Sequence, residues 1–101
     1  MRISDFLEPG LENRITGREL QAATGLSETV LRKRIHDERM SGALILSSSE
    51  NGRNGYFLPA NLNELKAFDR FLEGTAASYE ELRPTFRKAI AELEARESHV
   101  D

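Results

Sequence analysis

The sequence predicts a mainly α-helical (α+β) fold, and three features of the chain lead to this prediction. Two helical segments with good capping residues lie on either side of a glycine, an order that is typical of a helix-turn-helix. A β-hairpin pattern follows the second helix, and apolar residues at helical spacing occupy the rest of the chain. We therefore expect a winged helix-turn-helix with a two-stranded β-hairpin wing and a C-terminal helical extension.

The composition is that of one small globular protein. The chain has 101 residues, of which 39% are hydrophobic and 31% are charged, and it contains no cysteine. The lack of cysteine excludes disulfides and thiolate metal sites, and it is typical of a reducing compartment. No apolar stretch has the length needed to span a bilayer, and the N-terminus lacks the apolar core of a signal peptide. We expect a cytoplasmic protein that does not bind membranes.

The first segment, residues 2–7, is expected to form a short helix. Its apolar side chains share one helical face. Pro9 and Gly10 end the segment, because proline disfavours helix in the residue before it and glycine tolerates a positive φ. Residues 11–15 are then expected to form a loop or a very short strand.

The helix-turn-helix is predicted from its capping residues. Thr16 and Glu19 have the spacing of a capping box, in which each side chain binds a free amide at the start of a helix. Gly25 is expected to end this helix, because glycine readily adopts the left-handed conformation of helix C-termini. One residue later, Ser27 is a good N-cap for a second helix, which is expected to extend to Met40.

Apolar residues one turn apart mark the buried sides of these two helices. We expect Leu20 and Ala23 to face the core from the first helix. On the second helix, Leu31 and Ile35 define the buried side, with Val30 at its margin. A helical wheel places a mostly polar, partly basic stripe on the opposite side of this second helix.

This polar stripe is the first candidate contact with nucleic acid. It consists of Thr29, Lys33, His36 and Met40, with Arg32 beside it. Cations bind phosphates, and short polar or forked side chains bind base edges in the major groove. We therefore expect the stripe to lie against duplex DNA.

A β-hairpin is predicted directly after the second helix. Residues 43–48 are rich in β-forming types, and residues 55–59 have the pattern of a return strand. Between them, residues 49–54 form a turn cluster that contains Asn51 and Gly52, a pair that strongly favours hairpins. A hairpin that follows a recognition helix is expected to act as a wing.

The full set of candidate DNA contacts combines the N-terminus of the second helix, the polar stripe and the wing. A helix N-terminus favours phosphate, and polar wing residues can reach the DNA backbone or the minor groove. The candidates are Ser27, Thr29, Arg32, Lys33, His36, Asn51, Arg53 and Asn54. Arg34 and Arg39 lie nearer the core side, where we expect them to pair with Glu38 or to cover the scaffold.

The charge distribution leaves two functions open. The formal net charge is −3, yet residues 14–56 carry seven Lys and Arg residues against five Asp and Glu residues. The basic middle of the chain favours DNA binding. The acidic total keeps an alternative, a protein–protein interaction adaptor that uses the winged-helix fold without binding DNA.

The C-terminal part is expected to form two helical segments or one bent helix. Asn61 and Glu64 have the spacing of a second capping box, and apolar residues follow at helical spacing. Ser78 with Glu81 offers a new helix start, and Pro84 would kink a continuous helix.

An apolar stripe runs along the last predicted helix. It consists of Tyr79, Leu82, Phe86, Ile90 and Leu93. Such a stripe belongs either to the core of one chain or to a partner surface. Because few other elements are left to cover it, we expect a homodimer formed through the C-terminal helices. The chain is thus divided into a winged-helix domain, residues 1–60, and a dimerisation segment, residues 61–101.

Catalytic and ligand-binding motifs are missing from the sequence. There is no P-loop, no Rossmann glycine pattern and no His-Glu-x-x-His motif. His36 and His99 lie far apart in the chain, so no metal site is expected. The serine run at residues 47–49 has no neighbouring base to activate a nucleophile. We expect neither an enzyme nor a bound cofactor, metal ion or small molecule.

Four stretches of the sequence carry a resemblance to a known family. They are Ile-Thr-Gly-Arg-Glu-Leu at residues 15–20, Thr-Gly-Leu-Ser at 24–27, the run from His36 to Ser48, and Gly-Tyr-Phe-Leu-Pro at 55–59. Together they resemble small winged-helix proteins encoded by phages and prophages of Gram-positive bacteria. The resemblance covers residues 13–60, and beyond them only the long helix is similar in kind.

The resemblance implies a DNA-binding accessory or regulatory factor in the cytoplasm of a bacterial host. Its role would be transcription regulation or assistance in DNA replication or packaging. The winged-helix pattern would place Thr29, Arg32, Lys33 and His36 on the recognition face and Arg53 on the wing. The helical wheel assigns the same four helix residues to the outer side.

Overall fold

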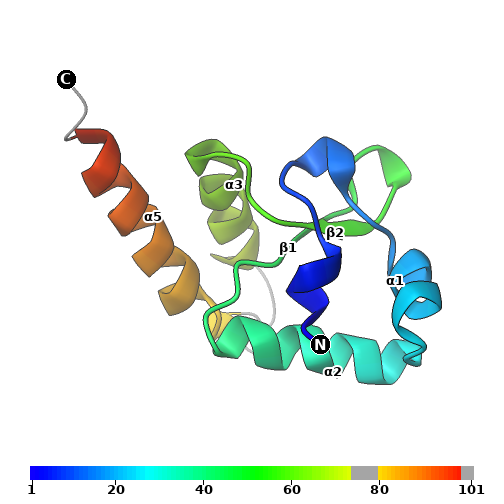
Figure 1. The fold of residues 1–101 in the computed structure, drawn as a ribbon. Coiled ribbons are helices and arrows are strands. Elements are labelled where there is room, and N and C mark those ends of the chain that lie inside the picture. The colour runs from blue at the N-terminus through cyan, green and yellow to red at the C-terminus, as the bar shows by residue number, and fades with distance from the viewer. Residues whose placement is uncertain (74–79, 99–101) are drawn as a thin grey trace.

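The structure, a computed structural model, describes residues 1–73 and 80–98 (Figure 1). It is mainly helical with a two-stranded antiparallel sheet, which agrees with the predicted α+β class. Its α-helices and strands are α1 (Gly17–Thr24), α2 (Glu28–Met40), β1 (Leu46–Ser48), β2 (Gly55–Phe57), α3 (Leu62–Glu73) and α5 (Arg83–Ser98). The short 3-10 helices η1 (Ile3–Phe6) and η2 (Leu11–Asn13) precede α1, and a third, η3 (Glu50–Gly52), lies between β1 and β2. None of the described helices combines the length and the apolarity that crossing a membrane requires.

The N-terminal segment forms the 3-10 turn η1, which is shorter than the helix predicted for residues 2–7. The carboxylate of Glu38 on α2 holds this turn, because Ile3 N donates to one oxygen at 2.6 Å and Ser4 N to the other at 3.1 Å. The Ile3 side chain is fully buried. Glu38 therefore anchors the start of the chain to α2.

The capping residues of α1 and α2 are those that the sequence predicted. The Thr16 hydroxyl accepts a hydrogen bond from Glu19 N at 3.1 Å, and the Glu19 carboxylate accepts one from Thr16 N at 3.3 Å. Gly25 ends α1 in the left-handed conformation, with a φ of 75°. Ser27 Oγ then accepts a hydrogen bond from Val30 N at 3.3 Å at the start of α2. The predicted order of helix, glycine turn and helix is confirmed.

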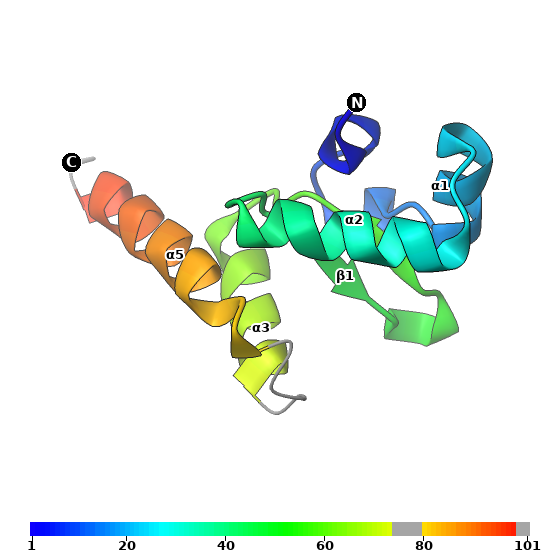
Figure 2. The same cartoon turned by 90° about the horizontal axis from the view of Figure 1, so that it is seen from below.

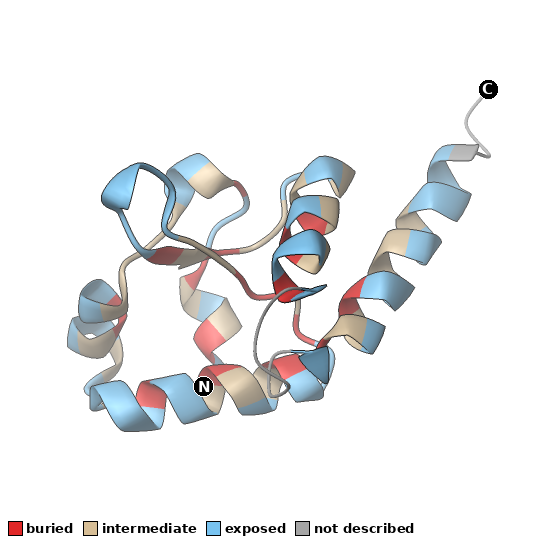
Figure 3. Ribbon diagram, turned by 180° about the vertical axis from the view of Figure 1, so that it is seen from behind, coloured by how far each residue is buried: buried red, intermediate tan, exposed pale blue. Residues whose placement is uncertain are grey.

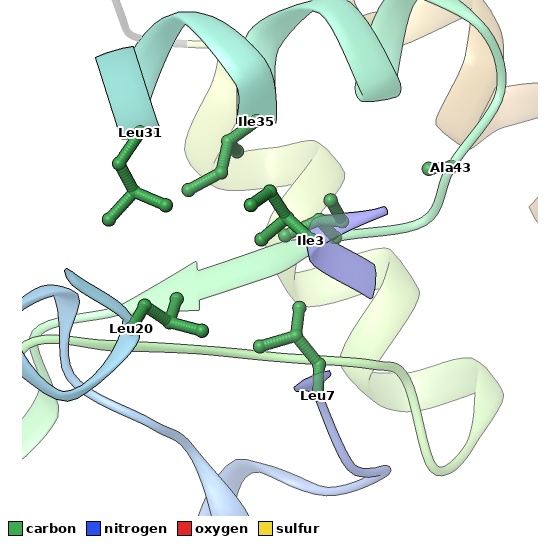
Figure 4. Close-up of a cluster of buried hydrophobic side chains, with 7 residues drawn as sticks. Ile3, Leu7, Leu20, Leu31, Ile35 and Ala43 are labelled. Atoms are coloured by element: carbon green, nitrogen blue, oxygen red, sulfur yellow. The ribbon is translucent and has the colours of Figure 1, made fainter. Parts of the chain in front are cut away.

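The first core cluster lies between η1, α1 and α2. In Figure 4, Leu31 and Ile35 extend from α2 toward the side chains of η1 and α1. The buried members are Ile3, Leu7, Leu20, Leu31, Ile35, Ala43 and Ile45. Ala23 is exposed, so the prediction that it faces the core is wrong. The short helix α1 enters the core only through its buried residue Leu20.

The sheet is a hairpin of short strands. Leu46 pairs with Phe57, and Ser48 pairs with Gly55. Ile15 extends the sheet by an isolated antiparallel bridge to Tyr56, with two backbone hydrogen bonds of 2.8 Å. The predicted hairpin is confirmed, although its strands are shorter than predicted, and the expected short strand before α1 is reduced to this bridge.

The hairpin turns at the predicted asparagine–glycine pair. Asn51 has a φ of 59° and Gly52 a φ of 72°, and both values lie in the left-handed region. Asparagine and glycine tolerate this region better than other residues do. The turn therefore forms where these two residues follow each other.

A second core cluster joins the hairpin to α3 and α5. Its buried members are Leu46, Phe57, Leu65, Phe68, Leu72, Leu82 and Phe86. The rings of Phe68 and Phe86 meet edge to face with centroids 4.9 Å apart. Beside them, the carboxylate of Asp69 accepts two hydrogen bonds from Arg83, and this bonding raises the pKa of Arg83 above its ordinary value. The hairpin is thus packed between two core clusters.

The predicted capping box of α3 is present only in half. Asn61 Oδ1 accepts a hydrogen bond from Glu64 N at 2.9 Å, as expected. The Glu64 carboxylate, however, accepts its hydrogen bonds from Ala60 N at 2.9 Å and from Leu11 N at 3.0 Å. The side chain that was expected to close the box instead ties η2 to α3.

In the described residues of the C-terminal part, α3 ends at Glu73 and α5 begins at Arg83, so these two helices are separate. The predicted helix start at Ser78 and the first stripe residue, Tyr79, lie outside the described residues. Leu82 and Phe86 are fully buried within the protomer, and the later stripe residues pack partly against the same cluster. The described part of the stripe therefore contributes to the core, and α5 runs beside α3 as far as Glu94, whose carboxylate lies 3.8 Å from Lys66 Nζ (Figure 1).

Candidate nucleic-acid interface

The outer side of α2 is open to solvent over most of its length. Thr29, Arg32, Lys33 and Met40 are exposed, as the helical wheel predicted, and Val30 at the margin is 45% exposed. Figure 2 shows α2 in front of the sheet, with no other described element crossing its outer side. A large part of the predicted stripe is therefore accessible to a partner.

Two cations of this stripe are already paired with carboxylates on α2 itself. Arg32 lies 2.8 Å from Glu28, and Lys33 lies 3.1 Å from Asp37. Exposed pairs four residues apart on a helix contribute about 0.3–0.5 kcal/mol each, so both cations can turn to another anion at small cost. The four side chains together, however, carry no net charge.

His36 is the predicted contact that is least free. Its Nε2 atom lies 3.0 Å from Oε1 of Glu81, which precedes α5, and the imidazole is half-buried. The contact is an ion pair only when the imidazole is protonated. Glu81 thus covers one end of the predicted stripe, and His36 would have to leave this carboxylate before it could bind a base edge.

The N-terminus of α2 lies at the surface. Ser27, Glu28 and Thr29 are all exposed. The Ser27 hydroxyl is engaged in capping the helix, as described above, so Ser27 would contact a ligand through its backbone or through the free lone pair of its hydroxyl. The exposed start of a helix has the partial positive charge that favours a phosphate.

The three candidates in the hairpin, Asn51, Arg53 and Asn54, are exposed. The exposed Arg53 side chain is held at the surface by one hydrogen bond, from its Nη2 atom to the backbone oxygen of Arg14 at 3.2 Å. Asn51 adopts the left-handed backbone conformation of the turn. The hairpin tip is therefore an exposed surface, and the Arg53 side chain lies along its edge.

Arg14 braces the hairpin, and the sequence did not single it out. Its guanidinium donates hydrogen bonds to the backbone oxygens of Arg53 at 3.1 Å, Glu50 at 3.0 Å and Leu11 at 3.0 Å. A Cβ atom at Gly55 would lie 2.8 Å from Arg14 Cγ, so only glycine leaves room for this side chain. A glycine at the start of a strand was the available signal, but it does not say which side chain fills the space.

A groove of about 1040 Å³ brings together residues from α1, α2, the hairpin and α3. The predicted candidates Arg32, Arg53 and Asn54 line it, and so does Arg18 from α1, which the sequence did not single out. Figure 3, viewed from the side opposite to Figure 1, shows that much of α2 and of the hairpin turn is coloured as exposed. Ser27, Thr29, Lys33, His36 and Asn51 lie outside the lining of the groove.

One end of the groove is aromatic. Phe71 of α3 lines the groove and is 55% exposed, and its ring stacks on the buried ring of Phe68 with centroids 5.8 Å apart. An exposed phenylalanine beside a groove is suited to an apolar or aromatic group of a partner.

Arg34 and Arg39 serve the scaffold, as the sequence predicted, but Glu38 is not their partner. Arg39 is only 4% exposed, donates from Nε to the backbone oxygen of Ile45 at 2.7 Å and lies 5.2 Å above the Phe68 ring. Arg34 donates to the backbone oxygen of Met1 at 2.8 Å. Arg39 therefore links α2 to both core clusters.

The described residues contain no group of three or more His, Cys, Asp or Glu side chains placed to hold a metal ion. Comparison of the chain with protein-family models, with curated proteins and with solved structures finds no match.

Proposed function

We propose that the protein binds duplex DNA as a winged helix-turn-helix protein, with α2 as the recognition helix and the β1–β2 hairpin as the wing. One observation carries the proposal. Arg32 from α2 and Arg53 with Asn54 from the hairpin, which are distant in sequence, line the same open groove. A helix and a hairpin that present cations and amides to one groove can hold the backbone of a DNA strand while the helix enters the major groove.

In this arrangement the side chains have different tasks. Thr29, on the exposed first turn of α2, is placed to contact base edges. Arg32 and Lys33 exchange their carboxylate partners for phosphates, which costs little because both pairs are exposed. The protein acts in the cytoplasm of a bacterial host as a phage or prophage factor in transcription, replication or packaging. It works as a homodimer through its C-terminal helices.

A second candidate function is that of a protein–protein interaction adaptor. The observation in its favour is the exposed apolar surface, with Phe71 beside the groove and Met40, 51% exposed, at the end of α2. The balanced charges on α2 also suit a protein partner better than a polyanion. DNA binding and adaptor function differ sharply in their dependence on salt.

The test is a titration of a fluorescein-labelled random duplex with the full chain, followed by anisotropy at several salt concentrations. We expect binding that weakens steeply with salt, with a log–log slope that corresponds to about four to six neutralised phosphates per subunit. The variant R32E/K33E should abolish binding, because it replaces both cations of the exposed stripe with carboxylates beside Glu28 and Asp37. No binding by folded protein at low salt would contradict the proposal and favour the adaptor.

The matched control is K88E/R96E, which makes the same change in net charge on exposed positions of α5, outside the groove, and its oligomeric state is checked against the wild type by light scattering. It should bind DNA nearly as well as the wild type. Equal loss of binding in both variants would show that net charge, and not the α2 surface, determines the affinity.

A further inference from the structure

We propose that the main phosphate-binding site is the corner between α1 and the hairpin, where Arg18 and Arg53 bind the DNA backbone and Arg14 positions Arg53. This inference rests on the proposed function, because it assigns the DNA contacts of the same surface. It differs from the expectation drawn from the sequence, which placed the main cations on α2.

The cations at the corner are unpaired with carboxylates in the described part of the chain, whereas those on the outer side of α2 are paired. Among the residues that the structure describes, Arg14, Arg18 and Arg53 have no carboxylate oxygen within 4.0 Å, whereas Arg32 and Lys33 each have one. When a paired cation turns to a phosphate, its carboxylate partner is left uncompensated beside the DNA, so the pair neutralises less phosphate charge and releases fewer counterions from the DNA than a free cation does. The cations at the corner are those that gain most from a phosphate.

The three arginines of the corner differ in how many guanidinium N–H donors remain free. A guanidinium has five N–H donors. Arg14 uses three side-chain hydrogen bonds to hold backbone oxygens, while Arg53 uses one, to the oxygen of Arg14. Within the described part of the chain, Arg18 donates none from its side chain. Arg18 and Arg53 can therefore bind phosphate oxygens through two donors at once, and Arg14 acts by holding the loop.

The segments that carry Arg18 and Arg53 are rigidly connected. Arg18 and Arg53 both line the groove, although they belong to different elements. Backbone hydrogen bonds of 2.8 Å in both directions join Ile15, just before α1, to Tyr56 in β2. Gly17 lies against the Tyr56 ring, since a Cβ atom there would be 3.9 Å from Cε2. The start of α1 and the hairpin thus form one surface that needs little ordering when it binds.

The acidic residues of α1 and of the hairpin do not cancel the positive charge of this corner. Glu19 is held back by Thr16, whose backbone amide and hydroxyl both donate to its Oε1 atom. Glu50 is exposed on the hairpin turn. Glu28 and Glu64 also line the groove, but Glu28 is paired with Arg32, and Glu64 accepts hydrogen bonds from two backbone amides. Arg14, Arg18 and Arg53 against Glu19 and Glu50 therefore leave one positive charge in excess, whereas Arg32 and Lys33 with Glu28 and Asp37 leave none.

The test counts phosphate contacts with charge-neutral substitutions in the full chain. Salt series with the random duplex are measured for wild type, R18Q/R53Q, R32Q/K33Q and the remote pair K88Q/R96Q. We expect R18Q/R53Q to reduce the steepness of the log–log salt dependence by about 1.8, the value for two lost phosphates. R32Q/K33Q should reduce it by less than half as much, and K88Q/R96Q should leave it nearly unchanged.

The outcomes separate this inference from the proposed function. A wild-type chain that fails to bind at low salt contradicts DNA binding itself. A wild-type chain that binds, with R32Q/K33Q losing as much steepness as R18Q/R53Q or more, overturns the assignment of the corner and leaves DNA binding intact.

The role of Arg14 needs a separate variant, R14K, which keeps the charge but replaces the three donor nitrogens of the guanidinium with a single one. We expect weaker binding together with changed amide resonances at residues 49–54, since the turn loses its brace. Affinity and resonances equal to those of the wild type would overturn the positioning role.

Discussion

At the residue scale, three charged side chains hold the fold together through hydrogen bonds to backbone groups of other segments. Glu38 holds the N-terminal turn, Glu64 ties η2 to α3, and Arg39 links the two core clusters. The sequence placed Arg39 on the scaffold, but it could not identify these partners. Each contact joins segments that are brought together only by the folded chain, and no local pattern encodes it.

Replacing Arg39 with methionine should destabilise the protein by about 2 kcal/mol, because the backbone oxygen of Ile45 would lose its donor inside the core. Chemical denaturation followed by circular dichroism measures the free energy of unfolding. The control is Arg34→Met, which removes only an exposed hydrogen bond to the backbone oxygen of Met1 and should cost less than about 0.5 kcal/mol. Equal losses in the two variants would show that burial of Arg39 contributes nothing.

At the element scale, the boundaries of α1 and α2 and the turn of the hairpin could be predicted, because local residue types determine them. Thr16, Gly25, Ser27 and the Asn51-Gly52 pair each act within a few residues of their own position. The strand lengths and the second capping box were predicted less well. Both depend on contacts with distant segments, as the bond from Leu11 N to Glu64 shows.

The packing of the hairpin makes α3 and α5 part of the fold rather than an appendage. Leu46 and Phe57 are buried against residues of these two helices. A chain that ends at Pro59 would expose both side chains, so we expect it to unfold at a lower temperature or to aggregate. Thermal unfolding and light scattering measure this. A truncated chain that is monomeric and as stable as the full chain would contradict the shared second core.

At the scale of the whole molecule, the sequence predicted which side of α2 faces solvent. The structure shows how much of that side is accessible to a partner. Thr29, Arg32 and Lys33 are exposed, whereas His36 is engaged by Glu81. The sequence predicted no role for Arg14 or Arg18, because a lone arginine in a loop or at a helix start has no local signature. Their significance depends on the hairpin that folds back beside them.

The most direct measurement for the proposal that one face of this molecule binds DNA is a nuclear magnetic resonance titration of the ¹⁵N-labelled full chain with a short duplex. We predict that the amide resonances of the first turns of α1 and α2 and of residues 49–54 shift together, and that those of α5 after Phe86 do not. Shifts confined to α3 and α5, or no shifts at low salt, would contradict the account.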